Sequence, residues 1–260
     1  MKLRRTPNKG LLTDSSFPRR KAGLGMELRH YENTDSTNLR ARQWAGEDAS
    51  HGSVVLADYQ TSGRGRFERT WISDPGQNLL MTLILRANLP RPARLPLATA
   101  MAVLKCLKHV HSPLSLEVKW PNDVLVDGKK CAGVLVESPE EGLYLVGIGM
   151  NINQDSFPEV LPVDSRRGPT SLLLESGRRF DRREVYSALL DELESAMESM
   201  LEPDFIQIYS RLLCGVGEEI SLSTGQRGVF AGLSDDGGII IESGEGRKVF
   251  FAGDVSLREQ

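Results

Sequence analysis

The chain has 260 residues, of which 40% are hydrophobic and 26% are charged, and its formal net charge is −3 at pH 7. This length accommodates one or two domains, and the composition is that of a globular protein rather than a disordered one. The small negative charge gives no overall attraction to nucleic acid or anionic lipid. Three widely spaced cysteines without a CxxC pair argue against a disulfide framework and a zinc site. They favour reduced thiols in a cytoplasmic protein.

The first 25 residues are rich in arginine and lysine and show little periodicity. This composition predicts a disordered leader or a start assigned too early, since Met26 opens the first segment with an ordered pattern. A nucleic-acid-binding arm is the alternative. We expect no sequence-specific DNA binding, because no helix-turn-helix fits into so short a stretch. The segment also lacks the apolar region of a signal peptide.

Strand and helix patterns alternate through residues 26–214. Short apolar segments predict strands, and apolar residues three or four positions apart predict helices. Asp181 with Glu184 resembles a capping box, so a long helix is expected to begin there. The predicted strands are 53–58, 78–86, 114–119, 124–126, 129–136 and 143–148. The predicted helices are a short one ending at Trp44, then 93–110, 181–201 and 205–212.

The pattern changes after Cys214. Short strands follow one another closely, separated by turns rich in aspartate, glycine and serine, which predicts a small β-barrel or SH3-like module. These strands are 219–223, 228–233, 238–242 and 248–251. The expected organisation is a basic tail over 1–25, a larger domain over 26–214 and a small domain over 215–260.

A segment rich in glycine and arginine, QTSGRGRFERTW at residues 60–71, follows the strand at 53–58. Glycines let the backbone fold closely around a ligand, and arginines offer planar donors to phosphate or carboxylate oxygens. A plain solvated loop is the alternative, and this segment alone does not decide between the two.

The segment KWPND, residues 119–123, leads into a predicted hairpin with the two-residue turn Asp127-Gly128. In the register that this turn sets, Asp123 faces Ala132, and Lys130 is its diagonal neighbour on the same face. An ammonium and a carboxylate thus meet on one patch beside small residues. The alternative is a surface salt bridge of little energetic value.

Other chemistries are poorly supported. The chain has no P-loop motif, and Gly147-Ile148-Gly149 lacks the third glycine of a dinucleotide fingerprint. The four histidines show no metal-ligand spacing. Ser36 and Thr37, taken alone, are better explained as helix-capping residues than as ligand-binding ones.

In this order and spacing, the motifs together resemble the biotin–protein ligase family. The resemblance covers residues 30–258. The matching segments are DSTN at 35–38, Gln60 with GRGR at 63–66, KWPND at 119–123, KCAG at 130–133, GIGMNIN at 147–153 and AGDVSL at 252–257.

The resemblance implies an α+β fold: a catalytic domain with a mixed sheet, related to class II aminoacyl-tRNA synthetases, and a small SH3-like β-barrel domain. It implies an enzyme that forms biotinyl-5′-AMP and pyrophosphate from biotin and ATP with Mg²⁺. The enzyme would then transfer biotin to a specific lysine of a biotin carboxyl carrier protein or domain of a carboxylase. Lacking room for a DNA-binding domain, the chain resembles the monofunctional class. Whether it forms a homodimer is left open.

The resemblance also implies roles for individual residues. The catalytic residues would be Lys130, Arg64, Arg66 and Asp123. Biotin would be bound by Ser36, Thr37, Gln60, Gly63, Arg64, Lys130, Gly133 and Gly149, and ATP by Arg64, Arg66, Arg69, Trp71, Lys119, Asn122, Lys130 and Asn151. No protein cluster for a metal is expected, and Mg²⁺ would arrive with ATP near Asp123. The apolar walls of the biotin slot are expected to be Val54, Val55, Leu135 and Val146.

One position departs from the family pattern, because members commonly carry glycine where this chain has Glu68. We expect this acid to pair with Arg64 or Arg69 and to stiffen the loop. Three alternative functions remain: a lipoate–protein ligase, a nucleic-acid-binding regulator and an inactive biotin sensor. A lipoate ligase would not need the polar donors of Ser36, Thr37 and Gln60.

Overall fold

Two β-sheets organise the computed structural model, which describes residues 10–12, 14–111, 114–158 and 168–257. The larger sheet contains β1 (Leu28–Thr34), β2 (Ser53–Gln60), β3 (Leu79–Arg86), β4 (Leu116–Lys119), β5 (Asp123–Val126), β6 (Lys129–Glu140) and β7 (Leu143–Met150). Its strand order is β1-β2-β3-β7-β6-β5-β4. The β1–β2 pair is parallel and the other pairs are antiparallel, so the expected mixed sheet is confirmed.

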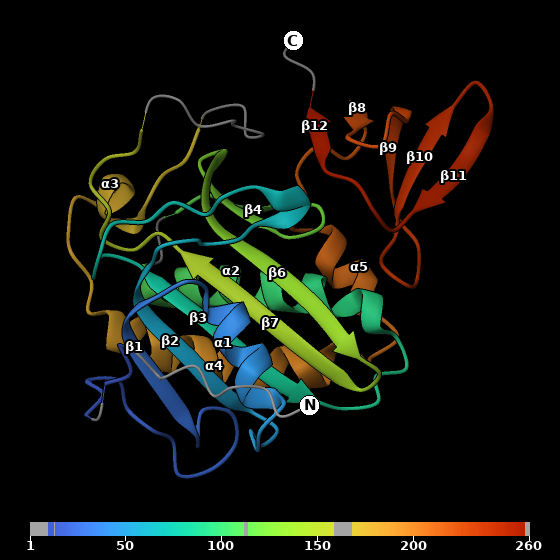
Figure 1. Cartoon of the computed structure of the whole chain (residues 1–260). Coiled ribbons are helices and arrows are strands. Elements are labelled where there is room, and N and C mark those ends of the chain that lie inside the picture. The colour runs from blue at the N-terminus through green and yellow to red at the C-terminus, as the bar shows by residue number, and fades with distance from the viewer. Residues whose placement is uncertain (1–9, 13, 112–113, 159–167, 258–260) are drawn as a thin grey trace.

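Helices cover both faces of this sheet (Figure 1). On one face α1 (Thr37–Ala45) packs against β2, β3 and β7 around Trp44. On the other face α2 (Leu95–Val110) and α4 (Arg182–Ser199) pack against each other and enclose the larger hydrophobic core. The short helices are α3 (Leu172–Ser176) and α5 (Phe205–Ser210). None of the helices within the described ranges is long and apolar enough to cross a membrane.

Residues 14–25 pack against the body of the protein, so the prediction of a disordered tail is wrong for them. Phe17 and Leu24 are only 4% and 5% exposed. The Phe17 ring meets two aromatic rings, on β1 and α4, edge-on at centroid distances of 5.1 and 5.4 Å. Arg20 forms ion pairs of 3.0 and 3.2 Å with two carboxylates of α4. These anchors hold a segment whose overall composition suggested disorder, whereas residues 1–9 lie outside the described part.

A second sheet forms the C-terminal module, which we define as residues 219–257 (Figure 1, orange to red). Its strands are β8 (Glu219–Leu222), β9 (Arg227–Leu233), β10 (Ile239–Ser243), β11 (Gly246–Phe250) and β12 (Val255–Leu257). They are antiparallel in the order β11-β10-β9-β8-β12, around buried apolar side chains such as Phe230 and Ile239. The expected small β-rich unit is thus confirmed.

A buried arginine attaches the C-terminal module to the larger unit. Arg94 is 1% exposed and donates hydrogen bonds to the carbonyl oxygen of Asp235 and to two carbonyl oxygens after α4. The indole Nε1 of Trp120 donates to the carbonyl oxygen of Gly237, at 3.0 Å. The turn between β9 and β10 is therefore fixed against the larger unit, which sets where the module lies relative to the sheet.

Candidate active site

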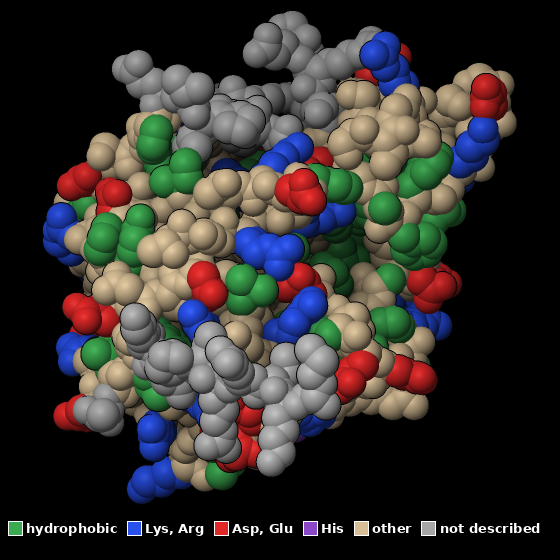
Figure 2. Space-filling view, viewed as in Figure 1, with side chains coloured by type: hydrophobic (Ala, Val, Ile, Leu, Met, Phe, Trp, Pro, Cys, Tyr) green, Lys and Arg blue, Asp and Glu red, His purple; other side chains and the backbone are tan. Residues whose placement is uncertain are grey.

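A pocket lies between the arginine loop (residues 60–71), the start of α1 and the strands β6 and β7. Lysine and arginine side chains, interspersed with acidic ones, gather at the middle of the face shown in Figure 2. All of the predicted site residues except Gly63 and Lys119 line this pocket. The structure therefore brings together side chains from five separate sequence motifs.

The start of α1 presents Ser36 and Thr37 to the pocket. Ser36 occupies the N-cap position, but its side chain makes no capping hydrogen bond within the described structure. The capping interpretation of this residue is therefore wrong. Ser36 is 2% exposed and lines the pocket, so its hydroxyl remains available to a ligand. Gln60 Oε1 accepts hydrogen bonds from the Thr37 backbone N–H and from Thr37 Oγ1, at 2.7 and 3.1 Å.

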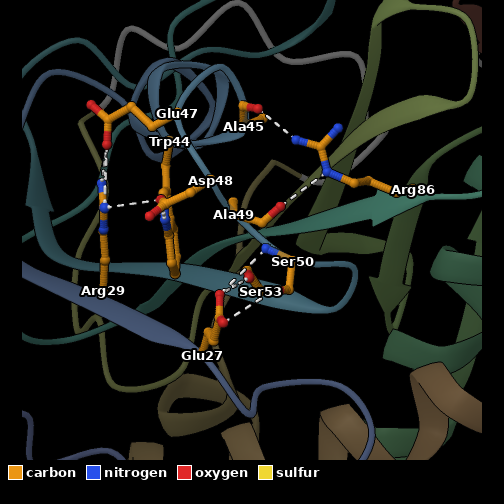
Figure 3. A network of polar contacts seen from close by, with 10 residues as sticks. All are labelled: Glu27, Arg29, Trp44, Ala45, Glu47, Asp48, Ala49, Ser50, Ser53 and Arg86. Atoms are coloured by element: carbon orange, nitrogen blue, oxygen red, sulfur yellow. Dashed lines mark hydrogen bonds and ion pairs between the residues drawn. The ribbon is translucent and has the colours of Figure 1, made fainter.

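The opposite end of α1 is fixed by a separate polar network (Figure 3). The Arg86 guanidinium donates to the carbonyl oxygens of Ala45 and Ala49, at 2.5 and 3.0 Å. Arg29 stacks over the Trp44 ring at 4.3 Å and pairs with Glu47 at 3.2 Å. Arg86 of β3 and Arg29 of β1 thus hold the C-terminal end of α1 against the sheet. This contact helps to fix the orientation of the helix, whose first turn lines the pocket.

The arginine loop is held on both sides by carboxylates. Arg64 pairs with Glu137 of β6 at 3.5 Å. Arg66 pairs with Asp254 at 3.0 Å and Arg69 pairs with the other oxygen of that carboxylate at 2.9 Å. Burial lowers the pKa of the Arg66 guanidinium, and the neighbouring carboxylates oppose this effect. Asp254 belongs to the C-terminal module, so the loop is fastened to both parts of the chain.

Glu68 does not pair with the loop arginines, so that expectation is wrong. Its side chain has no ion pair or hydrogen bond within the described residues, because Glu137 and Asp254 pair with Arg64 and Arg69 instead. Phe67 and Glu68 have φ angles of 51° and 59°, in the left-handed region that glycine adopts without strain. The glycine common in the family thus corresponds to a real backbone requirement at this position.

The Asp127-Gly128 turn has positive φ at both residues, 49° and 75°, as a type I′ turn requires. A β-bulge then shifts the register, so Asp123 faces Gly133 and not Ala132 as predicted. The bulge lies beside Lys130, whose backbone is hydrogen-bonded to another segment. Its N–H donates to the Gly168 carbonyl oxygen at 3.0 Å, and its carbonyl oxygen accepts from the Thr170 N–H at 2.8 Å.

The predicted pairing of a lysine and an aspartate on one face is nevertheless confirmed. Lys130 Nζ lies 2.7 Å from Asp123 Oδ1, and the two side chains are 33% and 13% exposed. Lys130 Nζ also lies 5.7 Å from the centre of the Trp71 ring, within the range of a cation–π interaction. A cation and a carboxylate are therefore half-buried together at the centre of the pocket.

Trp71 lies across the strands of the pocket floor. A Cβ atom at Gly149 would come within 2.5 Å of its ring, and one at Gly133 within 3.0 Å. A Cβ at Gly63 would lie 2.4 Å from the carbonyl oxygen of Trp71. These three glycines are therefore needed for the close packing of Trp71, whether or not they also contact a ligand.

Two asparagines in the pocket have different surroundings. Asn122 is satisfied within the protein, because it accepts from Arg66 at 3.2 Å and donates to the Val134 carbonyl at 2.8 Å. Asn151 is 3% exposed and donates to the Thr170 carbonyl at 2.9 Å. Its Oδ1 has no hydrogen-bond partner among the described residues, which leaves a buried acceptor in the pocket wall.

Lys119 and three expected apolar walls lie outside the pocket lining. Lys119 is 3% exposed, and burial lowers its pKa while Asp123 opposes this effect. Val54, Val55 and Val146 are fully buried in the hydrophobic cores, so only Leu135 of the four predicted walls lines the pocket. The apolar lining is supplied instead by Met81, Val134, Ile148, Ile72 and Phe157.

Sequence reasoning also missed three polar residues in or beside the pocket: Asn38, Glu137 and Asp254. Asn38 lies in the DSTN motif and Asp254 in the AGDVSL motif, so these motifs were the available signal. Glu137 follows an apolar strand and carried no signal of its own. All three act on neighbouring polar side chains, and such contacts between distant segments are visible only in the folded structure.

Comparison with known proteins agrees with this geometry. Residues 31–153 match the biotin/lipoate A/B protein ligase family, and residues 216–258 match the biotin protein ligase C-terminal domain. The biotin–[acetyl-CoA-carboxylase] ligase of Paracoccus denitrificans is 33% identical over 85% of this chain and 97% of its own length.

The chain therefore belongs to the biotin–protein ligase family. This biotin ligase is also 32% identical to the bifunctional ligase/repressor BirA of Bacillus subtilis, over 90% of the chain and 75% of BirA. The Aquifex aeolicus biotin protein ligase in complex with biotin and ATP superposes with a TM-score of 0.78. It is 31% identical, and the match covers 90% of this chain and 99% of that one. The match to the C-terminal domain model and the named relatives favour the biotin branch of the shared family model over the lipoate branch.

Proposed function

We propose that this biotin ligase activates biotin with ATP to biotinyl-5′-AMP and pyrophosphate. It then transfers the biotinyl group to one lysine of a biotin carboxyl carrier protein or domain of a carboxylase. The observation that carries this proposal is a single pocket with polar ring-binding groups at one end and cations at the other. We assign both steps to a catalytic domain, residues 26–214, assisted by a C-terminal domain, residues 215–260.

The biotin ring would lie against the start of α1. A ureido group offers one carbonyl acceptor and two N–H donors, so its site needs both donors and acceptors. Ser36, Thr37 and Gln60 supply hydroxyl and amide groups that are buried or half-buried at this end of the pocket. A dithiolane tail would leave these groups unpaired, which is the physical basis for preferring biotin to lipoate.

The first step joins two anions. A carboxylate oxygen of biotin attacks the α-phosphorus of ATP, and the bond from that phosphorus to the β-phosphate oxygen breaks. Arg64, Arg66 and Lys130 would offset the negative charge as it builds up. The acceptor Asn151 Oδ1 and the remaining loop cation Arg69 fit the nucleotide side.

Magnesium would enter as part of the substrate Mg-ATP. The described residues contain no group of three or more histidine, cysteine or acidic side chains that could hold a metal ion. Phosphate oxygens would therefore provide most of its ligands, with Asp123 the nearest candidate carboxylate. When bound, the ion neutralises phosphate charge.

The second step needs a neutral amine. A lysine with a pKa near 10.4 is neutral in fewer than roughly one molecule in a thousand at pH 7. Deprotonating it costs about 4–5 kcal/mol unless a nearby base takes the proton. The amine nitrogen attacks the biotinyl carbonyl carbon, the bond to the AMP oxygen breaks, and Asp123 is our candidate for the base.

Pyrophosphate release from the purified protein with Mg-ATP tests the proposal. We expect release that depends on biotin and not on lipoate or octanoate. Turnover with lipoate instead would assign the chain to the lipoate branch. Biotin binding without any release would make it a sensor, and in either case the proposed activity would be wrong.

A further inference from the structure

A buried chain of polar contacts connects the ring-binding end of the pocket with the arginine loop. Thr82 of β3 lies 2.9 Å from Thr37 Oγ1 and 2.6 Å from Asn38 Oδ1 through its hydroxyl. Asn38 Nδ2 donates to Glu137 Oε2 at 2.9 Å, and Glu137 Oε1 pairs with Arg64 at 3.5 Å. Thr82, Asn38 and Thr37 are 0%, 3% and 4% exposed, so water does not compete for these bonds.

The carboxylate at one end fixes the direction of the hydrogen bonds. An ionised Glu137 can only accept, so the Asn38 amide must turn its NH₂ toward Glu137 and its oxygen toward Thr82. The Thr82 hydroxyl must then donate to Asn38 Oδ1, because a carbonyl oxygen has no hydrogen to give. Thr82 has no second hydrogen, so it cannot also donate to Thr37.

This direction determines what the ring site offers to a ligand. Because Thr82 cannot donate to it, the Thr37 hydroxyl gives its hydrogen to Thr82 at 2.9 Å in preference to Gln60 Oε1 at 3.1 Å. The oxygen lone pairs of Thr37 then stay available as an acceptor. Gln60 Oε1 is occupied by the Thr37 backbone N–H, so the Gln60 amide NH₂ remains as the donor. An acceptor and a donor side by side match the N–H and C=O of a cyclic urea.

Gly147 of β7 leaves the space that the Asn38 amide occupies. A Cβ atom at Gly147 would lie 2.3 Å from Asn38 Oδ1, so a larger residue there would displace the side chain. Glu137 is 20% exposed and has two cationic neighbours, Arg42 of α1 and Arg64 of the loop, both at 3.5 Å. The Glu137 carboxylate therefore lies between two ion-pair partners and the Asn38 amide, and all three of these neighbours can donate hydrogen bonds to it.

We propose that Glu137 is a positioning residue that sets the hydrogen-bond polarity of the biotin-ring site through Asn38 and Thr82. Its second oxygen, paired with Arg64, ties that site to the loop that would close over the reacting groups. This inference rests on the proposed function, in which Thr37 and Gln60 hold the biotin ring. Glu137 is not among the residues that line the pocket, so it would act on the biotin ring only through Asn38 and Thr82.

The test uses the full chain and separates biotin affinity from ATP use. Biotin binding is measured by calorimetry without ATP, and KM values for biotin and ATP come from pyrophosphate release. Glu137→Gln keeps the size of the side chain but allows the Asn38 amide to reverse. We expect it to weaken biotin binding about tenfold, the effect of losing one charge-assisted hydrogen bond. The KM for ATP should not rise, because the Arg64 pair is loose at 3.5 Å with Arg64 45% exposed. The loop stays held by the shorter ion pairs of Arg66 and Arg69 with Asp254.

Thr82 supplies an independent variant pair. Thr82→Val removes the hydroxyl and should also weaken biotin binding about tenfold, whereas Thr82→Ser keeps it and should bind biotin within about twofold of the wild type. The double variant Glu137→Gln with Thr82→Val should be no weaker than the worse single variant, because both break one chain. Glu140→Gln, an exposed acid at the end of the same strand, is the matched control and should change nothing.

Three results would overturn the proposal: Glu137→Gln behaving like Glu140→Gln, equal increases in both KM values, or Thr82→Ser failing as badly as Thr82→Val. The last would mean lost packing rather than a lost hydroxyl. A wild-type protein that releases no pyrophosphate with biotin would instead contradict the proposed function. The calorimetric series still tests the polarity of the ring site in that case.

Discussion

Asp123 has two roles that oppose each other, one as the ion-pair partner of Lys130 and one as the proposed base. In the structure it neutralises Lys130 at 2.7 Å, and in the proposed transfer step it accepts a proton from the acceptor lysine. Asp123→Asn keeps the size and a hydrogen-bond acceptor but cannot take up that proton. We expect biotinyl transfer to slow about 100-fold, within the range of general-base catalysis, while adenylate formation falls less than about fivefold. Single-turnover transfer from preformed biotinyl-5′-AMP measures the second step alone.

Lys130→Ala gives the contrasting pattern, because this cation is proposed to act on the carboxylate and the α-phosphate. Adenylate formation should collapse with little change in melting temperature, since the side chain is 33% exposed. Equal loss of both steps in Asp123→Asn would count against its role as the base and would suggest that it only holds Lys130.

At the level of residues, the sequence predicts identities better than contacts. Side-chain alternation and a two-residue turn were sufficient to bring Lys130 and Asp123 together, because both depend on local geometry. The bulge was not predictable, since it depends on a bond between Lys130 and residues 168–170 far along the chain. Glu137 was missed for the same reason, because its partners lie on a helix and a loop that precede it by more than 70 positions.

The cap of α4 links one element to the pH dependence of stability. The side chain and the backbone N–H of Arg183 hydrogen-bond to Asp181 and lower the pKa of that carboxyl from 3.8 to about 2. A carboxyl whose pKa is lower in the folded state stabilises the fold above its unfolded pKa. This contribution is lost as pH falls from about 4 to about 2. Asp181→Ala should cost about 1 kcal/mol of unfolding free energy at neutral pH.

Urea unfolding at pH 7 and again near pH 2.5 measures this effect. The difference between wild type and Asp181→Ala should shrink at the lower pH, where the carboxyl is protonated in the unfolded state and partly protonated in the folded state. Asp181→Asn should keep most of the cap at both values, because an amide oxygen can still accept from the backbone N–H. A difference that stays constant with pH would show that the charge contributes nothing.

Among the elements, periodicity predicted the long amphipathic helices and the apolar strands. It predicted neither β1 nor α3. In β1 one of the buried residues is His30, which is 2% exposed. Its Nδ1 lies 3.2 Å from Ser15 Oγ, so this polar residue is buried against the N-terminal segment, for which disorder was predicted. α3 has five residues, too few to show a helical period. Both elements depend on tertiary contacts that a local pattern does not contain.

For the whole molecule, the change of pattern after Cys214 predicted a separate β-rich unit but not where it would lie. Its position follows from the buried Arg94 and from Trp120, which bind the turn between β9 and β10. This placement brings Asp254 to the rim of the pocket, where it is 12% exposed by its side chain. A residue of the C-terminal module thereby becomes part of the candidate active site.

Asp254→Asn tests whether the C-terminal module works through this contact. The variant removes the charge shared by Arg66 and Arg69 and leaves both guanidinium groups without their carboxylate. A half-buried cation that loses its partner is costly to keep in place, so the loop should leave its position against Asp254 more often. We expect the KM for ATP to rise about tenfold and trypsin to cleave faster in the arginine loop. The biotin affinity measured without ATP should change less than about twofold, because Thr37 and Gln60 do not touch Asp254.

Asp236→Asn is the matched control, since this acid lies in the same module, is 62% exposed and pairs loosely with Arg91 at 3.7 Å. It should leave the KM for ATP and the cleavage rate unchanged. If Asp254→Asn instead lowered the melting temperature while both kinetic constants stayed at their wild-type values, the carboxylate would serve to join the two units rather than to hold the loop. If the KM for ATP and the cleavage rate rose together, the ion pairs of Asp254 would be the route by which a β-rich module remote in sequence controls the nucleotide end of the pocket.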